Sequence, residues 1–192
     1  LNFNTYVEAD ITSDLSFRTT LGGNYFNRMG ITFQNPEFGD AANVAGRSRV
    51  DQTRQLAYTF NQVLTYDKNF DDDHYLNALI GHENYKNTRN FMYATRTGFP
   101  FPGNPQLAPG ATLEGADSYE DYHRIEGYFA QVSYSFKERY LLSGSVRRDG
   151  TSRFFPGVAG LGSNQWGTFY SVGAGWRISK ESFMDDVSWV ND

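Results

Sequence analysis

The sequence predicts an all-β protein, specifically a segment of a large antiparallel transmembrane β-barrel. Apolar and polar residues alternate with period 2 in one segment after another, which indicates strands with two different faces. The connections between these segments are alternately short and long. Aromatic residues, 17% of the chain, gather beside the short connections. Strands that carry apolar residues only at alternate positions can cross a membrane without any long apolar run.

Seven segments can be recognised, and six of them have one apolar and one small or polar face. In the fifth, Tyr128, Val132 and Phe136 alternate with Ser133 and Ser135. The segment at about 74–85 is less regular, and the sequence leaves its faces unassigned. The segments cover residues 1–11, 15–25, 56–66, 74–85, 128–136, 140–149 and 171–179. The residues predicted to face lipid are Tyr58, Phe60, Leu64, Tyr128, Val132, Tyr134, Leu142, Val146, Val172 and Trp176.

The length of the connections differs between the two ends of the predicted sheet. Short connections are expected near 12–14, 68–73, 137–139 and 180–186, and long ones at about 27–49, 89–121 and 150–166. Outer-membrane barrels have short periplasmic turns and long extracellular loops, so the short connections are assigned to the periplasm. The aromatic residues beside them are interpreted as an interfacial girdle: Tyr66, Phe70, Phe136, Tyr140, Trp176 and Phe183.

Seven strands are too few and of the wrong parity to close a bacterial barrel of this kind. Open strand edges within lipid would leave backbone groups without hydrogen bonds. Residues 1–192 are therefore expected to be part of a barrel domain. A soluble β-sandwich also alternates apolar and polar residues, and it remains the alternative.

Several other classes of function are not supported. The chain has no cysteine, and its net charge of −5 gives no reason to expect nucleic acid as a partner. Asp67, Asn69, Asp71 and Asp73 match the start of a calcium loop, but Asp72 and Ala78 then depart from it. The histidines His74, His82 and His123 lack metal-ligand spacing. Nothing pairs Glu83, Glu126 and Asp149 as a hydrolase would require. We expect no enzyme, no metal site and no cofactor.

The last third of the chain resembles a known family. The run Tyr140-Leu141-Leu142-Ser143-Gly144-Ser145-Val146-Arg147-Arg148-Asp149-Gly150-Thr151-Ser152-Arg153-Phe154 resembles a signature of the SusC/RagA family of TonB-dependent transporters. Trp166-Gly167-Thr168-Phe169-Tyr170-Ser171-Val172-Gly173-Ala174-Gly175-Trp176-Arg177-Ile178-Ser179 follows as in that family. Glu181-Ser182-Phe183-Met184 and Trp189-Val190-Asn191-Asp192 are also similar to it in order and spacing.

The resemblance implies an importer in the outer membrane of a Gram-negative cell, with a barrel of about 22 strands and an N-terminal plug. It implies a SusD-like surface lipoprotein as a partner and energy from the TonB complex, which would be contacted through an N-terminal region. The plug and the C-terminal barrel strands are expected to be missing from this sequence. Family substrates are oligosaccharides or peptides. The alternative function is a soluble glycan-binding β-sandwich or β-propeller fragment.

Candidate substrate-binding residues are Phe99, Phe101, Trp166, Arg147 and Asp149. Arg147 and Asp149, together with Arg153, either contact substrate or plug, or pair with neighbouring strands and fix the loop. Prolines stiffen the segment that carries Phe99 and Phe101, so contact there would cost little ordering entropy. Most other loop aromatics are expected to pack: Phe33, Phe38, Phe154 and Phe155.

Overall fold

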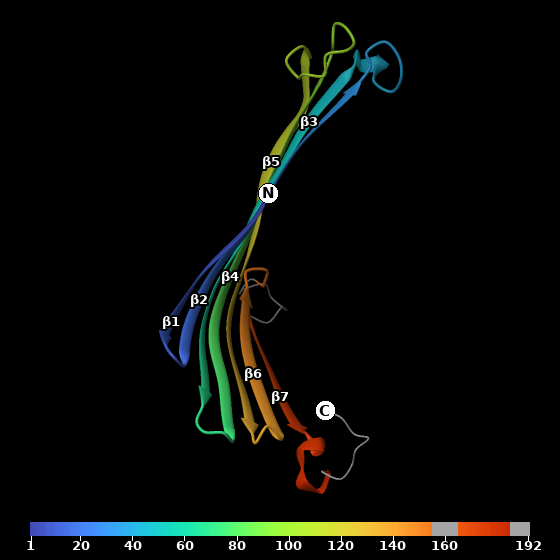
Figure 1. The fold of residues 1–192 in the computed structure, drawn as a ribbon. Coiled ribbons are helices and arrows are strands. Elements are labelled where there is room, and N and C mark those ends of the chain that lie inside the picture. Colours follow the sequence, from blue (N-terminus) through green and yellow to red (C-terminus); the bar gives the residue numbers. More distant parts are fainter. Residues whose placement is uncertain (155–164, 185–192) are drawn as a thin grey trace. The chain divides into compact units, whose positions relative to one another are not determined.

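The computed structural model describes residues 1–154 and 165–184. Within them, seven strands form one sheet in the order β1 to β7, so each strand pairs with its neighbours in sequence (Figure 1). The prediction of an all-β antiparallel segment is confirmed. The strands are β1 (Asn2–Thr12), β2 (Leu15–Gln34), β3 (Arg47–Asn69), β4 (His74–Thr97), β5 (Thr112–Phe136), β6 (Tyr140–Thr151) and β7 (Trp166–Trp176).

Three 3₁₀ turns complete the described secondary structure: η1 (Ala42–Val44), η2 (Ile178–Lys180) and η3 (Ser182–Met184). None of the helical elements in the described part of the chain is long and apolar enough to cross a membrane. The predicted seventh strand extended to 179, but β7 ends at Trp176 because the chain turns into η2. The backbone N–H of Arg177 makes a last bond to the carbonyl of Arg139, at 2.8 Å.

The short connections lie where the alternation predicted them, between β1 and β2, β3 and β4, and β5 and β6. The fourth, predicted at 180–186, continues past residue 184 and so ends outside the described residues. Two long connections were predicted too wide. The loops occupy only 35–46 and 98–111, because β2, β3, β4 and β5 continue as strands through sequence in which the alternation is interrupted. The third lies between β6 and β7, and its residues 155–164, including Phe155, are outside the described residues.

The described chain divides into two compact units. The first comprises residues 1–3, 23–58 and 86–123, and it contains both described loops, 35–46 and 98–111. The second comprises 4–22, 59–85 and the described residues from 124 onward, and it contains the short turns. Two apolar side chains among the described residues are buried, Ala41 and Phe99. The sheet therefore has very little core of its own.

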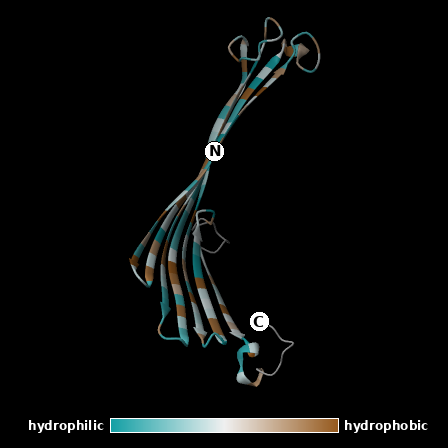
Figure 2. Cartoon of the chain, in the orientation of Figure 1, coloured by the Kyte–Doolittle hydropathy of each residue, from teal (hydrophilic) through white to brown (hydrophobic). Residues whose placement is uncertain are grey.

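The register of β5, β6 and β7 gives the second unit two different faces. Val132 lies opposite Gly144, which lies opposite Val172, whereas the next row joins Ser133, Ser143 and Gly173. Because strand side chains alternate between faces, the apolar and the polar rows are on opposite sides of the sheet. Figure 2 shows apolar and polar residues alternating along these strands.

The apolar face of these three strands is uncovered. Val132 is 44% exposed, Leu142 54% and Val172 80%. A soluble domain would bury such a contiguous row against another layer, and no second layer covers it within the described residues. This face is suited to an apolar environment outside the chain.

Contacts of β4 settle the faces that the sequence left unassigned. The ring of His74 lies 4.8 Å from that of Phe136, and the ring of His82 lies 4.9 Å from that of Tyr128. Both histidines therefore share the apolar side. Gly81 lies beneath the ring of Phe129 on the polar side, where a Cβ would approach the ring to 2.2 Å.

An aromatic row closes the apolar face at the short turns. Phe136 stacks on Tyr140 at 6.2 Å and Tyr140 on Trp176 at 6.5 Å, measured between ring centroids. Glu181 holds the row in place, accepting from the Tyr140 hydroxyl at 2.6 Å and the Trp176 indole at 3.0 Å. These donors, the hydroxyl first, lower the pKa of the Glu181 carboxyl. Arg139 adds an ion pair at 3.1 Å.

We expect Val132→Arg to destabilise the full-length protein by about 2–4 kcal/mol, because it places a charge on the apolar face mid-strand. The matched change on the opposite face, Ser133→Arg, should fold normally. The measurement is assembly of heat-modifiable barrel in isolated outer membranes. Equal assembly of the two variants would show that the faces are assigned wrongly.

Glu181→Gln should lower the denaturant midpoint of the detergent-solubilised full-length protein at pH 7. Because folding lowers the pKa of Glu181, the ionised carboxylate stabilises the protein above its ordinary value, about 4.5, and this stabilisation is lost as the pH falls through the lowered value. The denaturant midpoints of wild type and variant should therefore become equal in acid. A difference that stays constant from pH 7 to pH 3 would contradict the ionised contact.

Candidate functional site

A charge cluster occupies the polar face of the second unit. On β6, Arg147 Nε donates to both carboxylate oxygens of Asp149, at 2.8 and 2.9 Å. Its Nη2 reaches across β5 and donates to Glu83 Oε1 on β4, at 3.0 Å. One guanidinium thus links two carboxylates on strands that are not neighbours. Of the two alternatives left by the sequence, ion pairing is therefore present, but within β6 and across to β4, and not with a neighbouring strand.

Strand β5 makes room for this cluster with a glycine. Gly127 lies opposite Asp149, and a Cβ there would come within 2.4 Å of Asp149 Oδ1 and 2.8 Å of Arg147 Nη2. The guanidinium carbon also lies 5.4 Å from the ring centroid of Phe129. A side chain at 127 would displace the bridge, so the cluster depends on this glycine.

The sequence found two members of the cluster and missed the third. Glu83 lies 64 residues from Arg147 in a strand whose faces were unassigned, so nothing in the sequence joined them. Arg153 takes another position, in the turn after β6, where its backbone N–H donates to Thr151 Oγ1 at 3.4 Å. Contact of Arg147 and Asp149 with substrate stays a prediction.

A groove lies beside the short turns of the second unit. Its volume is about 640 Å³, and small residues of the polar face make much of its lining: Ser133, Ser135, Ser143, Gly173 and Gly175. Because these side chains are short, the backbone of three strands can be approached closely. The lining offers hydroxyl groups, and Glu138 and Arg177 add one charge of each sign.

The first unit carries a group of aromatic rings that the sequence did not single out. Phe91 lies 5.4 Å from Tyr119 and 6.1 Å from Tyr93, and Arg49 places its guanidinium 4.0 Å above Tyr93. Tyr119 is half-exposed. The residues were missed because 89–121 was predicted as a loop, although the spacing of Phe91 and Tyr93 already has the period of a strand. Phe91 and Tyr93 occupy odd positions of β4, as Glu83 does.

Phe99, predicted to bind substrate, belongs instead to a small core between the two loops. It is 3% exposed and packs edge-on against Phe33, with ring centroids 5.3 Å apart. Its backbone N–H donates to the Ala45 carbonyl at 2.6 Å. This burial gives no support to the prediction that Phe99 binds substrate. Phe101 is 53% exposed and stays a candidate for substrate binding.

Trp166 lies on the apolar face, opposite Gly150 in the register of β6 and β7. Its ring stacks with that of Tyr128 at 6.1 Å. A residue on this face points away from the charge cluster and the small-residue groove. Its placement therefore gives no support to the prediction that it binds substrate, and it favours an interfacial role.

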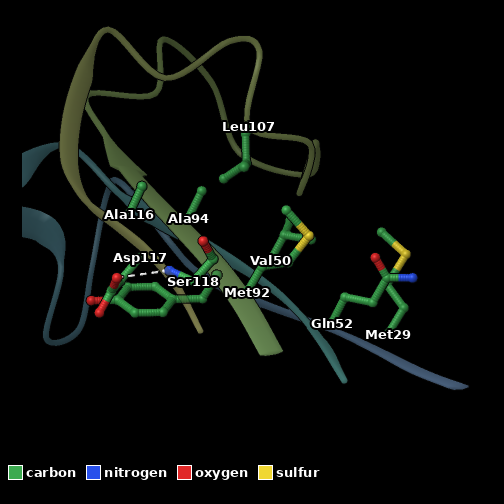
Figure 3. Close-up of a pocket in the computed structure, with 10 residues that line it drawn as sticks. Met29, Val50, Gln52, Met92, Ala94, Leu107, Ala116, Asp117 and Ser118 are labelled. Atoms are coloured by element: carbon green, nitrogen blue, oxygen red, sulfur yellow. Dashed lines mark hydrogen bonds between the residues drawn. The ribbon is translucent and has the colours of Figure 1, made fainter. Parts of the chain in front are cut away.

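A second cavity, of about 600 Å³, lies in the first unit (Figure 3). Met29, Val50 and Met92 contribute to its apolar lining, and Leu107 extends toward it from the loop. Asp117 is its single ionisable group apart from Tyr93, and it accepts from the backbone N–H of Ser118 at 2.7 Å. No group of three or more metal-ligating side chains occurs within 1–154 and 165–184. The arrangement suits binding and has no evident catalytic chemistry.

The chain is similar to TonB-dependent receptors along nearly its whole length. It is 29% identical to TonB-dependent receptor P39 of Formosa agariphila over 97% of the chain, which is 18% of that receptor. It is 28% identical to the TonB-dependent receptor SusC of Bacteroides thetaiotaomicron over 93% of the chain, which is 17% of SusC. No family model matches the chain.

Solved structures agree with the sequence relatives. The structure of the RagAB peptide transporter superposes with a TM-score of 0.87 and 25% identity, covering 100% of this chain and 21% of that one. The closed-closed state of the RagAB peptide importer has the same fold, with a TM-score of 0.85. The chain thus spans about a fifth of the length of the proteins it matches. These matches support membership of the SusC/RagA family of TonB-dependent receptors, with the chain corresponding to a partial segment of the β-barrel.

Proposed function

We propose that this chain forms part of the barrel wall of an outer-membrane nutrient importer that takes up oligosaccharides or peptides in a TonB-dependent manner. One observation carries the proposal: strands β5 to β7 expose an apolar face on one side and a small polar face on the other. A membrane barrel needs this division, because one side meets hydrocarbon and the other meets water. The similarity to TonB-dependent receptors supports it.

In this proposal the apolar row meets the lipid of the outer membrane, and the polar row lines the import path. Serine and glycine leave space along the lining and carry no charge, so a polar solute passes without strong retention. The linked side chains of Glu83, Arg147 and Asp149, two carboxylates on one guanidinium, give the lining a fixed polar feature of formally negative net charge. These residues position the wall and offer hydrogen bonds to a plug or to substrate.

Substrate capture is assigned to the aromatic group of Phe91, Tyr93 and Tyr119, with exposed Phe101 as a further contact. Aromatic faces stack on sugar rings and on apolar peptide side chains alike. Strands of more than 20 residues are about twice as long as a membrane crossing requires. Phe91 and Tyr93 are distant in sequence from the short turn before His74, which suits a position where an external solute first meets the barrel.

The proposed partners follow from the same family. A SusD-like lipoprotein would deliver substrate at the outer surface, and the TonB complex would supply energy through an N-terminal region. RagAB, one of the similar structures, is described as a peptide transporter. SusC and P39 are described as TonB-dependent receptors. Both substrate classes therefore remain in the proposal.

Phe91→Ala combined with Tyr119→Ala should weaken substrate binding by about three- to tenfold per ring lost, because each stacked ring contributes about 0.5–1.5 kcal/mol. The measurement is binding of an oligosaccharide panel and a peptide panel to the full-length receptor with its lipoprotein. Phe60→Ala, an exposed ring predicted to face lipid, serves as the control. Equal losses in the two variants, or none in either, would contradict the assignment.

A further inference from the structure

The apolar band of the second unit ends in a second aromatic row. The first row contains Phe136, Tyr140 and Trp176, and the second contains Tyr128 and Trp166, which stack on each other. The rows are separated by eight residues along β5 and ten along β7. At about 3.3 Å per residue and a tilt of about 35–45°, this separation corresponds to about 19–27 Å. The apolar band of an outer-membrane barrel has a height of about 25 Å.

The two rows therefore mark the two surfaces of the membrane. The row with Phe136 lies at the short turns, and the row with Tyr128 and Trp166 lies toward the long connection between β6 and β7. Since long connections are extracellular in these barrels, Tyr128 and Trp166 are assigned to the outer leaflet. The sequence predicted an aromatic girdle only at the short turns, and it did not predict this second row.

Arg148 lies in the same outer row, on the apolar face. It is opposite Tyr128 on one side and Thr168 on the other, and its guanidinium is 5.5 Å from the ring centroid of Trp166. It is exposed, and within the described residues no carboxylate lies in ion-pair range of it. Its neighbour Arg147, on the opposite face, has two. Among the described residues, nothing balances the charge of Arg148 at the proposed membrane surface.

The acidic group of this face is already engaged. Glu126 Oε1 accepts from the Tyr128 hydroxyl at 2.9 Å and lies 3.0 Å from His82 Nε2. His82 also contacts Gln62 through Nδ1, at 2.7 Å. The carboxylate of Glu126 is thus engaged by Tyr128 and His82 and not by Arg148. The guanidinium of Arg148 is therefore available to a group outside the chain.

We propose that Arg148, supported by Trp166, binds the phosphate of an outer-leaflet lipid. A planar guanidinium presents paired N–H donors that match two phosphate oxygens, and it tolerates partial dehydration. The Trp166 indole, 5.5 Å from the guanidinium carbon, restricts the side chain of Arg148, which reduces the ordering cost of binding. The proposal rests on the location in the outer membrane and is independent of which substrate is imported.

The test uses the full-length receptor in detergent, titrated with diphosphorylated lipid A and read by native mass spectrometry. Arg148→Gln should weaken lipid A binding by about tenfold, since a charge-assisted contact is lost. Arg147→Gln, the same residue type on the opposite face, should bind lipid A like wild type. Arg177→Gln is a second control in case the change at Arg147 impairs folding. Dephosphorylated lipid A should bind wild type and Arg148→Gln equally.

Competition with inorganic phosphate separates the possible sources of the phosphate group. A lipid site requires the acyl chains against the apolar band, so inorganic phosphate at tenfold molar excess over lipid A should not displace it. Displacement at that excess would overturn the proposal in favour of a free-anion site. Equal lipid A binding by wild type and Arg148→Gln would overturn it as well. Neither result would bear on substrate uptake, which is measured separately.

Discussion

The structure depends on the continuous backbone ladder that joins β5, β6 and β7 in one register. That register brings Val132, Gly144 and Val172 into one row and Ser133, Ser143 and Gly173 into the next. A slip of one residue would move every apolar side chain to the other face. Because almost no apolar side chain of the described chain is buried, the ladder is the main source of order, and packing follows from it.

The two faces of the sheet carry side chains of different size. On the apolar face, large residues fill the band and aromatic rings end it, held at the short turns by Glu181. On the polar face, small residues leave space, and Gly127 admits a guanidinium that spans three strands. Here glycine leaves space for a neighbouring side chain, whereas in turns it allows an unusual backbone conformation.

Charge is also divided between the faces. Arg147 and Arg148 are adjacent in sequence, yet alternation sends one to two carboxylates and the other to an aromatic ring at the proposed membrane boundary. From the sequence alone, two adjacent arginines suggest a single basic patch. The pleat separates it into a structural bridge and a surface-facing cation, each with its own chemistry.

The sequence by itself determined the strand faces of β5 to β7, the short turns and the family, because alternation and local motifs depend on neighbours in the chain. Only the tertiary structure decided that Glu83 joins Arg147, that Phe99 is buried against Phe33, and that Phe91 and Tyr119 form one aromatic group. Each of these pairs joins residues far apart in sequence, and their meeting depends on register between strands, which alternation does not encode. The loops were predicted too long for a related reason. In these parts of β4 and β5 the alternation of apolar and polar residues is interrupted, and the order of the strands comes from hydrogen bonds to the neighbouring strand.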